Sequence, residues 1–434
     1  MKQLTRLFIP ICLETLFYML SGMVDTLMLS AVGDYAVGAV GTANSYIGIF
    51  IIMFSIISSG MVSVMTQNIG AGRPGVAYQA RQLGLLFNAV AGVLMAVFLF
   101  SGAGAILRMV GIADALYEPA LIYLKIVGGG GILNAVIPIF SSYLRAFGYT
   151  KQPLYATIVG NIANFVMNAV FLFVLHKGVA GVATATVISK ILNLCIVLYF
   201  SHKLISAKNS TERIANKTVL GQIVKVGLPS ACETALYNVA MMLVIRFLNQ
   251  MDAEGLNVTA RSYTATISNF SYCVGAALAQ ANAIMTGWHI GAGELEECDR
   301  GTKRAAFVGV CVAVCMETAI VLGSGFIMPL FTDNPEMTAL VRKLLAIDIV
   351  LEIGRVTNLV FGQALKTSGD AVFPAVIAAV FMFVFAVGGT WLFGISMGLM
   401  AVGAYIGLAS DECVRAVGMV WRWKTGKWRT KKLV

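Results

Sequence analysis

The chain has 434 residues, of which 58% are hydrophobic and only 12% charged, and its mean hydropathy is +0.83. Soluble domains carry about 25% charged residues, so this composition excludes an ordinary soluble protein and predicts a chain that crosses a membrane many times. The net charge of +10 does not point to nucleic acid as a partner, because the cations gather at the ends of apolar segments, as expected beside an anionic leaflet.

Charge-free stretches long enough to span a bilayer recur along the chain. A hydrocarbon core about 30 Å thick needs about 20 helical residues, and residues 35–72, 83–107 and 371–410 contain no Asp, Glu, Lys or Arg. The alternation typical of a barrel is absent, so helices must satisfy the backbone in lipid. We predict an all-α integral membrane protein with about twelve spans, centred near residues 18, 55, 95, 132, 164, 189, 236, 275, 317, 353, 382 and 409.

The two halves of the chain repeat each other. IPICLETLFYML from Ile9 returns as LPSACETALYNV from Leu228, and NIGAGRPG from Asn68 returns as HIGAGELE from His289. YLRAFGYTKQP from Tyr143 returns as ALKTSGDAVFP from Ala364, so the offset is 219 residues for the first match and 221 for the other two. Duplicated hydrophobic halves are typical of secondary transporters, whose substrate site lies where the halves meet.

The longest polar connection lies midway and sets the expected domain boundaries. We predict an N-terminal lobe of helices 1–6 (residues 1–202), a cytoplasmic linker (203–218), a C-terminal lobe of helices 7–12 (219–422) and a basic cytoplasmic tail (423–434). The first apolar segment is too long for a cleaved signal and should remain as the first span. Lys and Arg gather on one side when the spans alternate, so both termini are expected in the cytoplasm of a bacterial cell, with the protein in the plasma (inner) membrane. The tail RWKTGKWRTKK from Arg422 is expected to anchor at the membrane interface.

Motifs of other functional classes are missing from the sequence. There is no GxxxxGK[ST] loop, so ATP is not expected to drive the protein, and no HExxH or GxSxG motif, so an enzyme is not expected. The eight cysteines are scattered and are interpreted as small apolar packing residues in the reduced form. We expect no cofactor other than Na⁺ or H⁺ as a coupling ion.

The first helix carries two acids, Glu14 and Asp25. Their spacing of eleven residues places them on one face, about 16 Å apart along the axis, on a stripe that includes Tyr18 and Ser21. Such a polar face must contact water or protein rather than lipid. The acids either bind a cation or a substrate, or they pair with a basic residue or a helix end nearby.

The fifth and sixth helices offer oxygen atoms that suit a cation. Asn161, Asn164 and Asn168 are spaced three and four apart and lie on one side. Amide oxygens are hard ligands suited to Na⁺, although such faces also hold helices together. Thr186 on the sixth helix adds a hydroxyl.

The second half differs chemically from the first. Glu233 repeats Glu14, but Val244 stands where the first half has Asp25. The tenth helix carries Asp348, Glu352 and Arg355, with Asn358 beside them, and this group suits a structural ion-pair network as well as a substrate contact. Three cations, at Arg246, Lys190 and Lys125, are expected to cap spans or extend to the interface. Glu317 on the ninth helix has no partner that the sequence identifies.

The order of these motifs resembles a known family. Pro10 and Glu14 followed by MVDTLMLSAVGDYAVGAVG, then QNIGAGRP, LRAFGYTKQP, NFVMNAVFLF and GVATATVIS, are similar to the pattern of the multidrug and toxic compound extrusion (MATE) family over nearly the whole chain.

The resemblance implies two six-helix lobes around a central cavity and antiport of organic, cationic or amphiphilic compounds against Na⁺ or H⁺. It implies that Asp25 binds or loses the coupling cation, with Asn164, Asn168 and Thr186 as partners. Glu14, Tyr18, Asn161, Glu233, Tyr237, Glu352, Arg355 and Asn358 are candidates for the cavity or the substrate site.

One branch of the family has an acid at the position of Asn168, which puts a mechanism with two acids in doubt here. Another branch has acids at the positions of Tyr237 and Arg355, so we expect one coupling-cation site per chain, in the first lobe.

An exporter or flippase of a lipid-linked, peptide or siderophore-like metabolite remains the alternative, with Arg355, Arg246 and Lys125 as its candidate cations. We expect the protein to work as a monomer.

Overall fold

The computed structural model of the protein describes residues 2–109, 112–205, 212–252 and 254–434. These residues form helices and turns and contain no β-strand. The predicted all-α membrane fold is thus confirmed. An apolar chain in lipid must satisfy its backbone hydrogen bonds within each segment, and only helices do so without a closed barrel.

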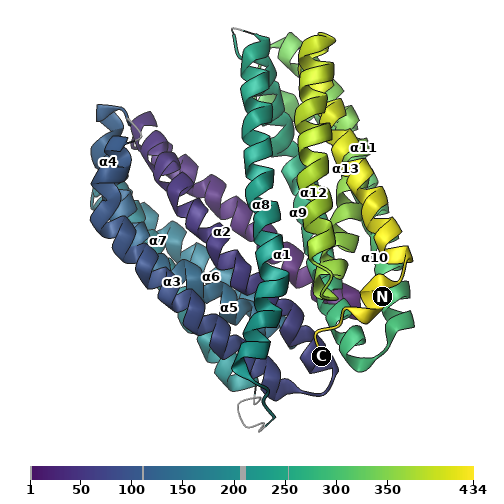
Figure 1. The fold of residues 1–434 in the computed structure, drawn as a ribbon. Helices are drawn as coiled ribbons and strands as arrows, with labels where there is room; N and C mark the ends of the chain where they lie inside the picture. Colours follow the sequence, from purple (N-terminus) through teal and green to yellow (C-terminus); the bar gives the residue numbers. More distant parts are fainter. Residues whose placement is uncertain (1, 110–111, 206–211, 253) are drawn as a thin grey trace. The chain divides into compact units, whose positions relative to one another are not determined.

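The described chain packs as two compact units, each with its own internal contacts. The first unit runs from Ile9 to Gly227 and the second comprises Leu228–Val434 together with the residues up to Phe8. Figure 1 colours them from purple to teal and from teal to yellow. The helices that lie wholly or mainly in the first unit are α1 (Lys2–Ser30), α2 (Asp34–Gly70), α3 (Pro74–Met109), α4 (Asp114–Gly129), α5 (Gly131–Ala146), α6 (Lys151–Ala169), the π-helix η1 (Val170–Val174) and α7 (Gly178–Leu204).

The boundary between the two units falls within one helix, α8, so each unit contains part of it. Its elements are α8 (Asn216–Met251, from Leu228 onward), α9 (Leu256–Ala292), α10 (Leu295–Ile327), η3 (Met328–Leu330), α11 (Pro335–Thr367), α12 (Val372–Phe381), η4 (Met382–Val387), η5 (Thr390–Ser396), α13 (Met400–Lys424) and η6 (Lys427–Thr430). The predicted lobe boundaries stay predictions, and residues 206–211 of the predicted linker lie outside the described residues.

Every predicted span centre lies in a described helix. Among the described residues, eight helices are long and apolar enough to cross a bilayer by themselves, and α4 with α5, bent by 43° at their junction, would make a ninth. The remaining long helices, α9, α11 and α13, fall short because they are polar. In α11 and α13 the polarity comes from buried charged residues such as Asp348 and Arg415. Charged residues inside a membrane span more often mark a functional site than a wrongly assigned span.

The repeat in the sequence has a counterpart in the backbone. The fifth helix of the first half ends in a π-helix, η1, and its equivalent in the second half ends in the π-helix η5. Both π-helices end with an equivalent backbone hydrogen bond. Leu175 N donates to Val170 O in the first half and Met397 N donates to Leu392 O in the second, each over 2.9 Å. The halves therefore share local irregularities as well as helices.

Helix α11 packs on three other helices of the second unit, α9, α10 and α13. Gly354 permits the approach of α13, because a Cβ atom there would lie 2.7 Å from the backbone nitrogen of Cys413. This contact brings the charged residues of α13 beside those of α11.

The C-terminal tail is packed against the protein. Trp423 and Trp428 are 1% exposed and stack with ring centroids 4.2 Å apart, and Trp423 donates to Asp299 Oδ1 over 2.7 Å. These are the two tryptophans of the tail motif, so the expectation that they serve as interface anchors is wrong. Each indole N–H needs a hydrogen-bond partner when buried, and each finds one within the fold.

Candidate functional site

The structure brings three of the predicted cation ligands together in the first unit. Asn168 on α6 donates its side-chain amide to Asp25 Oδ1 on α1 over 2.8 Å and to Asn164 Oδ1 over 3.1 Å. Asn164 and Asn168 are one turn apart and buried, whereas Asp25 is half-buried. We call Asp25, Asn164 and Asn168 the Asp25 cluster.

One oxygen of the Asp25 cluster remains available. Among the described residues, the buried Asn168 Oδ1 has no hydrogen-bond partner. A carboxylate with a neighbouring amide oxygen that has no partner offers donors for a hard cation. The bonds between the side chains also agree with the interpretation that these amides hold helices together.

Thr186 is not joined to the Asp25 cluster by a hydrogen bond in the described structure. Its hydroxyl donates to Val182 O of its own helix over 2.9 Å. The hydroxyl of Tyr123 on α4 lies next to Thr186 and Asn44, and within electrostatic range of Asp25. Tyr123 is a neighbour that the sequence did not suggest, because nothing in the apolar stretch around it marks the face on which it lies.

Lys190 on α7 was expected to cap its span or extend to the interface, and that expectation is wrong. Its ammonium group lies within electrostatic range of Asp25 and donates to Asn134 Oδ1 over 2.7 Å. The position of Lys190 in the middle of an apolar span could have indicated a buried, partnered role, because ionisable residues inside spans are usually paired. The Asp25 carboxylate is thus partly balanced by a cation.

The other candidates on α1 and α6 do not join the Asp25 cluster. Glu14 is buried and its Oε1 lies 2.5 Å from Nη2 of Arg145 at the end of α5. Asn161 donates to the carbonyl oxygen of Phe17 over 3.0 Å, and Tyr18 is 73% exposed. Of the two interpretations of Glu14, the geometry therefore favours the ion pair.

The repeat duplicates this ion pair. In the second unit, Glu233 Oε2 lies 2.7 Å from Lys366 Nζ. Glu233 is the repeat of Glu14, and Lys366 is the repeat of Arg145. An acid near the start of each half is thus paired with a base at the end of a later helix. The matched motifs contain both residues of each pair, but the sequence does not show that they meet.

The second unit holds a cavity of about 480 Å³. It is lined by four of the predicted candidates, Glu233, Tyr237, Arg355 and Asn358, while Glu352 is fully buried behind the lining.

Arg355 bridges two acids at this cavity. It forms an ion pair with Glu352 one turn earlier on α11 and lies 3.6 Å from Glu412 Oε1 on α13. Asn358 donates to the other oxygen of Glu412 over 3.1 Å. The ion-pair interpretation of the α11 residues agrees with this geometry, because Arg355 lies between two acids at the cavity wall.

Residues of α13 complete the charged lining, and the sequence did not single them out. Arg415 pairs with Asp411 over 2.8 Å and with Glu412 over 2.9 Å. All are buried. The stretch ASDECVRAV in the last span was the signal that could have identified them.

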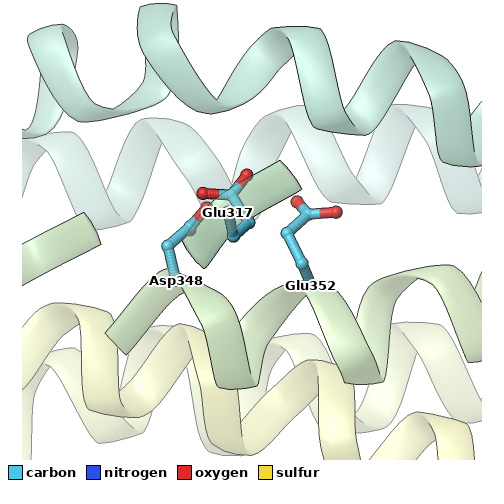
Figure 2. A group of neighbouring side chains, drawn as sticks. All are labelled: Glu317, Asp348 and Glu352. Atoms are coloured by element: carbon cyan, nitrogen blue, oxygen red, sulfur yellow. The ribbon is translucent and has the colours of Figure 1, made fainter. Parts of the chain in front are cut away.

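Glu317 on α10 has neighbours in the structure. One of its carboxylate oxygens and one each from Asp348 and Glu352 lie within 4.8 Å of one another, as Figure 2 shows for the three side chains. We call these residues the acid triad.

Comparisons with known proteins agree with the resemblance. The pattern of the MatE family matches residues 10–170 and 229–392. The chain is 32% identical over 428 residues to the uncharacterized transporter YisQ of Bacillus subtilis, covering 97% of this chain and 94% of that protein. It is 20% identical to a probable multidrug resistance protein NorM of Thermotoga maritima, covering all of this chain and 94% of that one.

Solved structures share the fold. An outward-facing multidrug resistance MATE transporter superposes with a TM-score of 0.85 at 21% identity, covering 98% of this chain and 96% of the other. A MOP superfamily transporter from Pyrococcus furiosus also superposes with a TM-score of 0.85, at 20% identity and over 99% and 96% of the two chains.

Proposed function

Since the chain belongs to the MatE family of transporters and is a multi-pass membrane protein, we propose that it exports organic compounds by antiport against Na⁺ or H⁺. The compounds are cationic or amphiphilic, and the mechanism is alternating access. The protein acts as a monomer in the bacterial plasma membrane with both termini in the cytoplasm, without ATP or catalysis.

The Asp25 cluster is the observation that supports cation coupling. A half-buried carboxylate in a span, hydrogen-bonded to one amide and close to a lysine, changes its interactions when it gains or loses a cation. Coupling requires that the cation and the substrate favour different states, because a ligand that binds both states equally shifts neither. Binding at Asp25 alters the contact between α1 and α6, so it can bias the conformation of the first helix.

The test is efflux from proteoliposomes with the Na⁺ and pH gradients imposed separately. Wild type is expected to export a fluorescent organic cation under one of the two gradients. Asp25→Asn keeps the shape of the side chain but removes the charge, so it should abolish coupled export while the protein remains folded. Asp333→Asn, which alters an exposed acid in the turn before α11, is the matched control.

Export by Asp25→Asn at the wild-type rate under a saturating gradient would show that Asp25 is structural. Coupling-ion dependence lost in Glu233→Gln but kept in Asp25→Asn would instead place coupling in the second half.

One observation favours the alternative substrate class. Arg261 lines the cavity of the second unit and donates to Met241 Sδ over 3.7 Å, and in the described chain no carboxylate lies within ion-pairing distance of it. A guanidinium without an acidic partner suits a phosphate or carboxylate of a lipid-linked or siderophore-like metabolite. Of the cations expected for that class, Arg355 is already paired, and Arg246 and Lys125 do not line the cavity. Competition by anionic amphiphiles for export, lost in Arg261→Met, would support this class.

A further inference from the structure

The acid triad lies in the interior of the second unit. Glu317 and Glu352 are 0% exposed and Asp348 is 3% exposed. Figure 2 shows Glu317 reaching from α10 toward Asp348, with Glu352 one turn along α11. Three carboxylates that converge without solvent repel one another strongly if all are ionised.

The cations around the acid triad do not balance its charge. The connected group contains the carboxylates of Glu317, Asp348, Glu352, Asp411 and Glu412 and the guanidinium groups of Arg355 and Arg415. Three negative charges are therefore in excess when every group is ionised, and two remain if Arg261, which lines the same cavity, is included. Buried charges without partners are costly, so the group needs positive charge from elsewhere.

Oxygen atoms of the acid triad also lack hydrogen-bond partners. Among the described residues, both oxygens of Glu317, Asp348 Oδ2 and Glu352 Oε2 are buried without one. The hydroxyls of Ser271 and Ser268 on α9 lie beside Glu317 and Asp348, yet they too form no hydrogen bond of ordinary geometry. Buried polar atoms that are left open in a group point to a missing ligand.

The fold itself does not require these acids. The offset of 221 residues aligns Glu317, Asp348 and Glu352 with Ala96, Val127 and Gly131 in the first half. The same helices therefore pack in the first unit without charge at these places. The acid triad was added to one half or lost from the other, which is expected of a functional feature rather than a scaffold.

We propose that the acid triad, with the hydroxyls of Ser268 and Ser271, binds one hard metal cation. The donors are all oxygen, which suits Na⁺ or Ca²⁺ and not the softer transition metals. Asp348 and Ser268 line the cavity, so the cation enters from it, while Glu317 closes the site from behind. The residues differ from Tyr237 and Arg355, and the site would be a second cation site beside the one expected at Asp25 in the first lobe.

This inference does not rest on the proposed role of Asp25, and the test separates the two. Purified full-length protein is equilibrated with ²²Na⁺ or ⁴⁵Ca²⁺ at fixed pH, and bound ion is counted per chain. Glu317→Gln and Asp348→Asn should each lose one bound ion relative to wild type and to the control Asp333→Asn. Asp25→Asn should retain that ion, and the isotope that is lost identifies the cation.

Ser271→Ala removes only a hydroxyl and keeps the test valid where a carboxylate variant fails to fold. Its affinity for the same ion should fall about tenfold, as for other changes around a bound metal. Wild-type binding of both ions by folded Glu317→Gln and Asp348→Asn would overturn the proposal. So would a wild type that binds neither ion at the acid triad, since protons would then neutralise it.

Discussion

The duplicated ion pair allows a sharp test of how each half is held together. In the first unit, the side chains of Arg145 and Glu14 are 18% and 12% exposed and meet at 2.5 Å. Arg145→Met keeps most of the apolar stem but leaves the Glu14 carboxylate buried, with Oε2 already lacking a hydrogen-bond partner among the described residues. The variant therefore isolates the cost of a buried charge without its counter-ion.

Removing one partner of a buried pair costs about 3–5 kcal/mol. The residual exposure of both side chains screens part of this, so we expect Arg145→Met to lose about 2–4 kcal/mol of unfolding free energy. The double variant Glu14→Gln with Arg145→Met removes both charges and should lie within about 1 kcal/mol of wild type. The double variant should therefore cost less than the two single variants together, by more than about 1 kcal/mol.

The assay is equilibrium unfolding in mixed micelles for wild type, both single variants and the double variant. The cycle on Glu233 and Lys366, whose side chains are 20% and 13% exposed, should give a coupling energy of similar size because the repeat preserves the geometry. A double variant that loses as much as the two single variants together would refute the reasoning, since the charges would then be independent.

Three further predictions concern other contacts. Asn164→Ala and Asn168→Ala should weaken the dependence of export on the coupling ion more than they lower thermal stability; equal loss of stability with unchanged ion dependence would favour the role in holding helices together. Gly354→Ala should destabilise the protein by about 1–3 kcal/mol, because its methyl group would meet the backbone of α13 at 2.7 Å, whereas Gly362→Ala on the same helix has its nearest atom at 3.9 Å and should be nearly neutral in unfolding experiments. Between α8 and α9, burial acts to raise the pKa of Asp252, but hydrogen bonds from Asn257 and Leu256 outweigh it and lower that pKa. Wild type should therefore be more stable than Asp252→Ala above the ordinary Asp pKa of about 3.9 and lose this advantage as the pH falls through the lower folded value; an advantage that persisted in acid would contradict this.

The sequence alone predicted the helices, the repeat and the shared helix face of Asn164 and Asn168 in the Asp25 cluster. Charge-free stretches and the positions of Lys and Arg are local properties, so spans could be recognised one at a time. The spacing of Asn164 and Asn168 is likewise local, because residues four apart on a helix share a face. Order and spacing of motifs then sufficed to indicate the family.

Only the tertiary structure decided which charges meet. Arg145 lies 131 residues from Glu14, and the pairing of Arg355 with Glu412 depends on how closely α11 and α13 approach at Gly354. Glu317 could not be interpreted because its neighbours come from another helix, whose rotation and depth no local pattern specifies. Long-range pairing depends on packing, and packing depends on the shapes of all the helices at once. The membrane fold is therefore determined by composition along the chain, and the candidate cation sites by the contacts between helices.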